Sequence, residues 1–187
     1  MMIFIKLLCL HLTLYQIERK YFVYLKPAGD FTNRIISIPF IYYILYLALK
    51  SDTSCSYFLA NYFLYDLIFM LSNFRYYLLF IVHHILCLVL IYIGYNQNFG
   101  TSIYIIFETT SPLLNITKIS KYLGFNCKIL KTITKNTYFL FRVVTPPIWI
   151  VYKLQNSYNH SWAHVYILSQ ITIIWLSSIV WWRKMKG

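Results

Sequence analysis

Two adjacent histidines, His83 and His84, lie in the middle of an apolar stretch that reads IVHHILCLVL at residues 81–90. A neutral imidazole can accept a proton from an amine or a hydroxyl near pH 7, and it can also attack a thioester directly. Ionisable groups within a membrane-length apolar run are functional candidates, because an unpartnered polar group is unfavourable there. The pair therefore predicts a site of acid–base or acyl chemistry, with a purely structural role as the alternative.

Three more ionisable residues, Asp66, Glu108 and Arg142, lie inside three other apolar runs. Each would cost about 2.5–3.5 kcal/mol if it faced lipid at a helix centre. A helical rise of about 1.5 Å per residue places all of them and the histidines at a similar depth. We expect them to meet in a central polar cavity. The alternative for Arg142 is a structural ion pair with Glu108 or Asp66.

Helical spacing indicates which side chains share a face. Asn115 follows Glu108 at i+7, with Ser111 between them at i+3, so this stripe faces inward. Glu108, Asn115 and Arg142 are the predicted substrate-binding residues, and His83, His84 and Asp66 are the predicted catalytic residues.

No metal site is predicted. His83 and His84 are separated by about 100° around a helix, so one can face the cavity while the other faces a neighbouring helix. His160 and His164 have i, i+4 spacing, but no acid or cysteine accompanies them, and an interfacial position fits them better. The cysteines are scattered and form no C-x-x-C pair; they are Cys9, Cys55, Cys87 and Cys127.

Prolines follow two of these residues at i+4: Pro112 follows Glu108, and Pro146 follows Arg142. A proline cannot donate to the carbonyl four residues earlier, so both helices should kink there. The freed carbonyls must find partners within the membrane. Either they line the polar cavity, or nearby threonines and neighbouring helices bind them.

The elements that must position these side chains are helices. The chain has 187 residues, of which 59% are hydrophobic and only 12% charged, which is typical of a membrane domain. The apolar runs lack the two-residue alternation of barrel strands, and the fold class is therefore all-α, a polytopic bundle of six to seven spans. Several runs are shorter than about 20 residues, which favours a thin membrane such as the endoplasmic reticulum. The runs cover residues 2–17, 35–49, 57–73, 77–95, 101–116, 137–152 and 163–182.

Basic residues fall mainly on one side of these spans. Most of the 17 Lys and Arg residues lie in the connections at 18–34, 74–76 and 117–136 and in the C-terminal tail. The positive-inside rule makes that side cytosolic. This topology accounts for the net charge of +12 without a nucleic-acid partner. The lysines of 117–136 are primarily a topology signal, and they would also attract anionic headgroups or the phosphates of an acyl-CoA.

Four short pieces carry a resemblance to a known family: YFLYDL at 62–67, the histidine pair, FETTSPLLN at 107–115 and YFLFRVVTPP at 138–147. In this order they resemble the TLC domain of translocation-associated TRAM proteins, ceramide synthases and smaller TLC domain-containing proteins. NRIIS at 33–37 resembles the Arg-x-x-Ser opening of that domain. The resemblance covers about residues 30–182, so we divide the chain into an N-terminal anchor helix and basic loop at 1–29 and a TLC-type domain at 30–187.

The resemblance implies a helix bundle around a lipid-accessible cavity. In ceramide synthases the paired histidines and nearby acids are held responsible for moving an acyl group from coenzyme A to a sphingoid amine, and His83, His84 and Asp66 match that motif. Glu108-Thr-Thr-Ser-Pro stands in place of the His-Asp-x-x-Asp element, and Pro39 and Phe40 stand near the position of a usual histidine. In these departures from the ceramide synthase pattern, the chain resembles the smaller TLC proteins.

Three candidate functions are therefore expected. The first is acyl transfer from acyl-CoA to an amine- or hydroxyl-bearing lipid, without a bound cofactor. The second is non-catalytic lipid binding or lipid homeostasis, and a translocation role is a third. Membrane lipids and acyl-CoA are the expected partners, and the C-terminus is expected in the cytosol.

Overall fold

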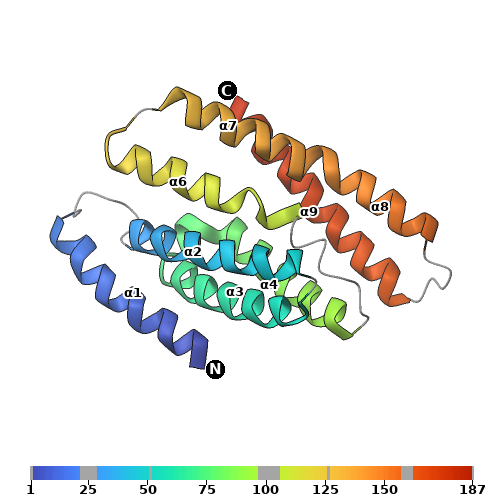
Figure 1. Cartoon of the computed structure of the whole chain (residues 1–187), viewed down its shortest axis with the longest axis horizontal. Helices are drawn as coiled ribbons and strands as arrows, with labels where there is room; N and C mark the ends of the chain where they lie inside the picture. The colour runs from blue at the N-terminus through green and yellow to red at the C-terminus, as the bar shows by residue number, and fades with distance from the viewer. Residues whose placement is uncertain are drawn as a thin grey trace.

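The computed structural model describes residues 2–21, 29–50, 52–96, 106–125, 127–156 and 162–186. Within these ranges the regular elements are all helices, which confirms the predicted all-α class (Figure 1). Their bounds are α1 Met2–Tyr21, α2 Asp30–Leu49, α3 Ser54–Ser72, α4 Phe74–Asn96, α6 Ser111–Tyr122, α7 Lys128–Tyr138, the π-helix η1 Phe139–Val144, α8 Thr145–Asn156 and α9 Trp162–Lys186.

Four described helices are long and apolar enough to cross a membrane. They are α2, α3, residues Phe74–Ile93 of α4 and residues Val165–Arg183 of α9. Each lies over one of the predicted apolar runs. Helix α1 covers the predicted run at 2–17, and α7, η1 and α8 form one uninterrupted helical stretch through the run at 137–152.

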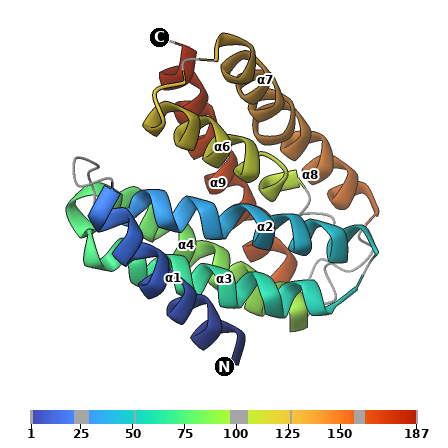
Figure 2. The same cartoon turned by 60° about the vertical axis from the view of Figure 1, so that its left-hand side comes forward.

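Helices α1, α2 and α3 pack against one another, α4 packs against α3, and α6 lies along α2 (Figures 1 and 2). Helix α9 packs against η1, α7 and α8 to form a second group, which lies on the other side of α6 in Figure 1. Helix α4 contacts both α3 and α9, so it joins the two groups. The predicted catalytic histidines therefore lie on the helix that joins the two groups, and Asp66 lies on its neighbour α3.

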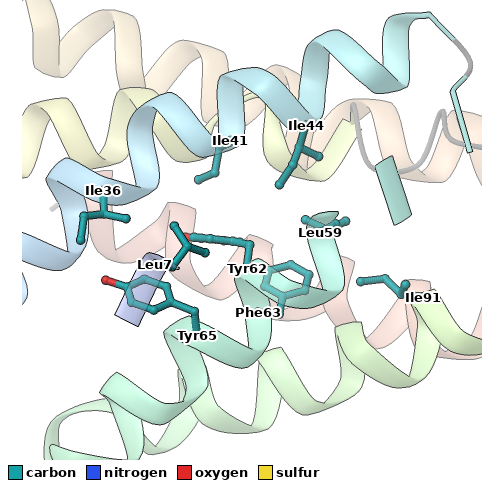
Figure 3. Packing of buried hydrophobic residues seen from close by; sticks show 9 residues of the cluster. All are labelled: Leu7, Ile36, Ile41, Ile44, Leu59, Tyr62, Phe63, Tyr65 and Ile91. Carbon is teal, nitrogen blue, oxygen red and sulfur yellow. The ribbon is translucent and has the colours of Figure 1, made fainter. Parts of the chain in front are cut away.

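The core of the first group is apolar and interdigitated (Figure 3). Ile41 and Ile44 of α2 are fully buried against Leu59 and Phe63 of α3. Helices in lipid associate through close packing and hydrogen bonds rather than through the hydrophobic effect. This packing fixes α2 beside α3 and so sets the distance between polar groups one or two turns further along. The cluster consists of Leu7, Ile36, Ile41, Ile44, Leu59, Tyr62, Phe63, Tyr65 and Ile91.

Helix α2 begins five residues before the predicted run at 35–49, because its N-terminus is capped from another helix. The carboxylate of Glu18 on α1 accepts hydrogen bonds from the backbone N–H groups of Gly29 and Thr32, both at 2.8 Å. A carboxylate at this position satisfies donors that have no partner within the helix and complements the helix dipole. Gly29 has a φ of 87°, and a Cβ there would lie 2.9 Å from the ring of Phe69, so a side chain would be excluded.

The predicted run at 101–116 is not one continuous helix. Residues 101–105 lie outside the described ranges, a helical turn covers 106–108, and α6 begins only at Ser111. Pro112 occupies the first turn of α6, where its missing N–H would have no partner anyway. Pro112 therefore starts a new helix, whereas a kink in a continuous helix was expected.

Just before Pro146, where a kink is expected, the chain forms the π-helix η1. The carbonyl of Val143, which faces Pro147 at i+4, accepts from the indole Nε1–H of Trp175 on α9 at 2.8 Å. The carbonyl of Leu140 accepts from the Thr145 hydroxyl at 2.8 Å. A threonine and a neighbouring helix thus bind the carbonyls of Leu140 and Val143, and the partners of the Glu108 and Arg142 carbonyls stay a prediction.

Candidate functional site

His84 on α4 and Asp66 on α3 form a buried pair, with His84 Nε2 2.7 Å from Asp66 Oδ2. The two residues are only 6% and 4% exposed, so water does not screen the contact. Phe63 lies one turn from Asp66, and its ring packs edge-on against the His84 ring with centroids 4.8 Å apart. The site therefore holds the His84 ring by a hydrogen bond on one edge and by aromatic packing.

The other nitrogen of His84 fixes the protonation of the pair. His84 Nδ1 lies 2.8 Å from the carbonyl oxygen of Phe80. A carbonyl only accepts, so Nδ1 must carry a hydrogen. One further proton then lies between Nε2 and Asp66, either as an imidazolium–carboxylate pair or as a neutral imidazole with a carboxylic acid. In both arrangements neither nitrogen of His84 is left over to act on a substrate.

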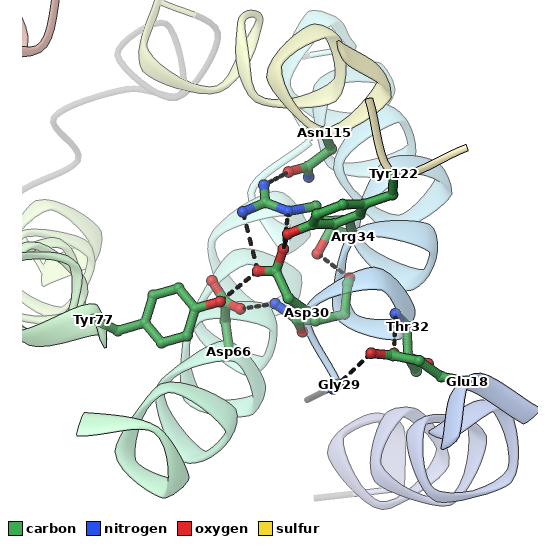
Figure 4. A network of polar contacts seen from close by, with 11 residues as sticks. Glu18, Gly29, Asp30, Thr32, Arg34, Asp66, Tyr77, Asn115 and Tyr122 are labelled. Atoms are coloured by element: carbon green, nitrogen blue, oxygen red, sulfur yellow. Dashed lines mark hydrogen bonds and ion pairs between the residues drawn. The ribbon is translucent and has the colours of Figure 1, made fainter. Parts of the chain in front are cut away.

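Asp66 is also held from α2. Its second oxygen, Oδ1, accepts from the side-chain amide Nδ2 of Asn33 at 2.5 Å (Figure 4). Sequence reasoning did not select Asn33, although it begins the NRIIS stretch that resembles the family opening. Asn33, Asp66 and His84 therefore connect three helices through one chain of hydrogen bonds.

His83 has different surroundings from His84, as their spacing on the helix predicts. It is only partly buried, and its Nε2 lies 3.6 Å from Sγ of Cys87 one turn later. The two imidazole rings are 5.6 Å apart between centroids. In the described part of the chain no three His, Cys, Asp or Glu side chains are grouped as metal ligands. His83 is thus the more accessible imidazole of the pair.

Arg142 on η1 is paired with Glu108, as one of the two predicted alternatives proposes. The direct contact from Nη2 to Glu108 Oε1 is long, at 3.9 Å, and Ser111 mediates a shorter route. The Ser111 hydroxyl donates to Glu108 Oε2 at 2.8 Å and accepts from Arg142 Nη2 at 3.0 Å. Arg142 Nε also donates to Thr110 at 3.0 Å, and the guanidinium lies over the ring of Phe107. These contacts hold the start of α6 against η1.

Asn115 belongs to a different network, which sequence reasoning missed (Figure 4). Its amide oxygen accepts from Arg34 Nη1 at 2.9 Å, while Arg34 Nε donates to Asp30 Oδ2 at 2.7 Å. The hydroxyls of Tyr77 and Tyr122 also donate to Asp30. Burial and the bond to Asp30 raise the pKa of Tyr122, so its phenol keeps its proton. The i, i+4 spacing of Asp30 and Arg34 could have indicated this network.

The predicted residues therefore lie in three groups: the His84–Asp66 pair with the His83 ring beside it, the Glu108–Arg142 pair, and Asn115 with Arg34. Asn115 contacts Arg34, and His160 lies outside the described residues.

Comparison with known proteins adds the family. The family model described as the TLC domain matches residues 30–186. No curated protein and no solved structure matches the chain. Because the family model spans most of the chain, and because its long apolar helices are of membrane-crossing size, the chain belongs to the TLC-domain family of integral membrane proteins.

Proposed function

We propose that this protein transfers a fatty acyl group from an acyl-CoA to the amine or hydroxyl of a lipid, with His83 as the general base. The proposal is supported by the different surroundings of the two adjacent imidazoles. His84 has both nitrogens engaged by Phe80 and Asp66, whereas His83 is partly exposed and has a weak contact to Cys87 besides the edge of the His84 ring. Membership of the TLC family supports a role in lipid metabolism.

The reaction needs one proton carrier. The acceptor nitrogen or oxygen attacks the thioester carbonyl as His83 takes its proton, the C–S bond breaks, and the imidazolium returns the proton to the departing thiolate. His84 and Asp66 act through His83: they fix α4 against α3 and place a polar, shared-proton pair beside the reacting imidazole. Glu108 and Arg142 would bind the substrate headgroup and the thioester carbonyl, and Asn115, in the separate Arg34 network, would be a further binding residue.

The proposed membrane topology brings acyl-CoA to this site from the cytosol. The chain makes six to seven crossings in the endoplasmic reticulum around a central polar cavity, with the basic connections and the C-terminus cytosolic. The Asp30 network lies at the ends of α2, α4 and α6 that adjoin these basic connections, near Arg75 and Lys121. Positive charge there would attract the phosphates of coenzyme A.

The test is acyl transfer by purified protein in lipid nanodiscs, with a radiolabelled long-chain acyl-CoA and either a long-chain amine or a long-chain alcohol. We expect product with the wild type and a loss of about 10²–10⁴-fold for His83→Ala, the usual contribution of a general base. Lys153→Ala, a substitution far from the histidines in sequence and on another helix, is the matched control. Equal turnover by wild type and His83→Ala would overturn the proposal.

Non-catalytic lipid binding is the second candidate. It is favoured by the observation that Glu108, Arg142 and Asp66 are all held by protein groups and so already form a satisfied polar layer. In that case lipid would copurify with the protein and exchange, but no acyl-CoA would be consumed. Product formation and lipid retention measured on the same nanodisc preparation separate the two functions.

A further inference from the structure

The side-chain oxygen of Asn33 is a buried acceptor without a partner among the described residues. Asn33 is 7% exposed, and its Oδ1 makes no hydrogen bond there. Buried polar atoms in proteins almost always have a partner, and the need is stronger inside a membrane. The atom lies on the same amide that holds Asp66, one hydrogen bond away from the His84 pair.

The orientation of this amide follows from its neighbours. Because His84 Nδ1 donates to Phe80, the shared proton of the pair lies between His84 Nε2 and Asp66 Oδ2. Asp66 Oδ1 therefore carries no proton in either arrangement and can only accept. Asn33 must turn its NH₂ group toward Asp66, and a flip that would bury the oxygen against the carboxyl is excluded.

The two hydroxyl groups linked to the backbone carbonyl of Asn33 have no free proton for Asn33 Oδ1. Ser37 donates to the backbone carbonyl of Asn33 at 2.7 Å. Tyr62 in turn donates to the Ser37 hydroxyl at 3.2 Å. Each hydroxyl has a single proton, and both are used. The missing donor must therefore come from outside this set of side chains.

We infer that Asn33 Oδ1 receives a hydrogen bond from an O–H or N–H group in the head of a bound lipid, beside the Asp66–His84 pair. This assigns a ligand-binding atom to α2 and a chemical requirement to the ligand, namely a free hydrogen-bond donor. It rests on the proposed function in one respect, because the lipid is taken to be the acyl acceptor. A lipid whose donor is methylated would leave the oxygen unpaired and would bind more weakly.

The test measures binding without a thioester, so turnover does not enter. The probes are hexadecanol and its methyl ether, and hexadecylammonium and its N,N,N-trimethyl analogue, each titrated into protein in nanodiscs and followed by tryptophan fluorescence. The wild type should prefer the donor-bearing member of at least one pair by roughly 5- to 100-fold. The alcohol pair and the ammonium pair distinguish an O–H from an N–H donor.

Asn33→Leu, similar in volume and without polar atoms, should lower this preference to about one. Asn61→Leu is the matched control, because Asn61 is another buried asparagine whose amide donates within its own helix to Tyr57 at 2.8 Å, and it should keep the wild-type preference. If the wild type binds both members of each pair equally, the inference is overturned, and water fills the position beside Asn33 Oδ1. This result is measured on the wild type and does not depend on whether the variants fold. Donor-selective binding without acyl transfer would overturn the proposed function and leave this inference standing.

Discussion

His84 Nε2 and Asp66 Oδ2 lie 2.7 Å apart across the α3–α4 contact, and each partner is held again from its far side. Phe80 accepts from the other His84 nitrogen, and Asn33 donates to the other Asp66 oxygen. The result is a chain of three hydrogen bonds from α4 through α3 to α2. A pair restrained at both ends has little freedom to rotate toward a substrate, so it positions the site rather than reacting itself.

The first prediction concerns the chemistry of this pair. In Asp66→Asn the new amide oxygen can accept from Asn33, and its NH₂ group can donate to Nε2 of a neutral His84. The geometry is preserved without a charge, so we expect a stability loss below about 1 kcal/mol. Asp66→Ala leaves both neighbours buried and unpaired and should cost about 3–5 kcal/mol. Thermal unfolding in detergent, followed by tryptophan fluorescence, measures both variants.

The outcome also separates the two proton arrangements of the pair. If Asp66→Asn destabilises the protein as much as Asp66→Ala does, His84 is an imidazolium that needs a carboxylate. The shared-proton arrangement with a neutral imidazole would then be wrong.

The second prediction separates the adjacent histidines by stability. His84→Ala removes a buried partner of Asp66 and should lower the free energy of unfolding by about 3–5 kcal/mol. His83→Ala removes a partly exposed ring with one weak sulfur contact and should change it by less than about 1 kcal/mol. Equal destabilisation by the two substitutions would contradict the division of roles. The same unfolding assay applies, with Val82→Ala as an exposed control on the same helix.

How far the sequence predicts the site depends on the range of the interactions. The apolar runs identify the helices because periodicity and length are local properties. An arginine within an apolar run predicts an acidic partner, and Arg142 has one in Glu108. Asn33 and Asp30 were missed because a polar residue near a helix start is ordinary in sequence. Only the packing of α2 against α3, α4 and α6 turns those residues inward.

The start of α2 shows the same limit. Its first turn looks like part of a basic connection, and the cap that makes it helical comes from Glu18, more than ten residues earlier on α1. Local capping rules find a side chain next to the helix start but not one supplied by another helix. The break before Pro112, in contrast, follows from a rule that the sequence already contains, since proline favours the first turn of a helix.

The third prediction concerns this cap. Glu18→Ala leaves the backbone N–H groups of Gly29 and Thr32 without their acceptor, and we expect a stability loss of about 1–2 kcal/mol. Glu18→Gln retains one acceptor oxygen and should lose about half as much. Gln16→Ala, an exposed position on the same helix, should be neutral. Hydrogen exchange at the Gly29 and Thr32 amides offers a second readout, because these N–H groups lose their acceptor, and unchanged exchange in Glu18→Ala would contradict the role of the cap.

The fourth prediction concerns the carbonyl that Pro147 leaves without a backbone donor. Trp175 of α9 donates to Val143 at 2.8 Å and so ties α9 to η1, the segment that carries Arg142. Trp175→Phe keeps an aromatic ring and removes only the donor. A carbonyl left unpaired between packed helices should then cost about 1–3 kcal/mol. Because η1 positions Arg142 against Glu108, acyl transfer should also fall, with a larger change in KM than in kcat if Arg142 binds the substrate.

Trp162→Phe is the matched control, since Trp162 lies on the same helix and is 88% exposed. It should unfold at the wild-type temperature and keep the wild-type KM. If a water molecule takes the place of the indole N–H, Trp175→Phe will destabilise the protein less. Trp175→His, which restores a ring N–H, will then not raise the stability above that of Trp175→Phe. Rescue by histidine, together with loss in the phenylalanine variant, would show that the hydrogen bond itself, rather than the bulk of the indole, holds the π-helix and its arginine in place.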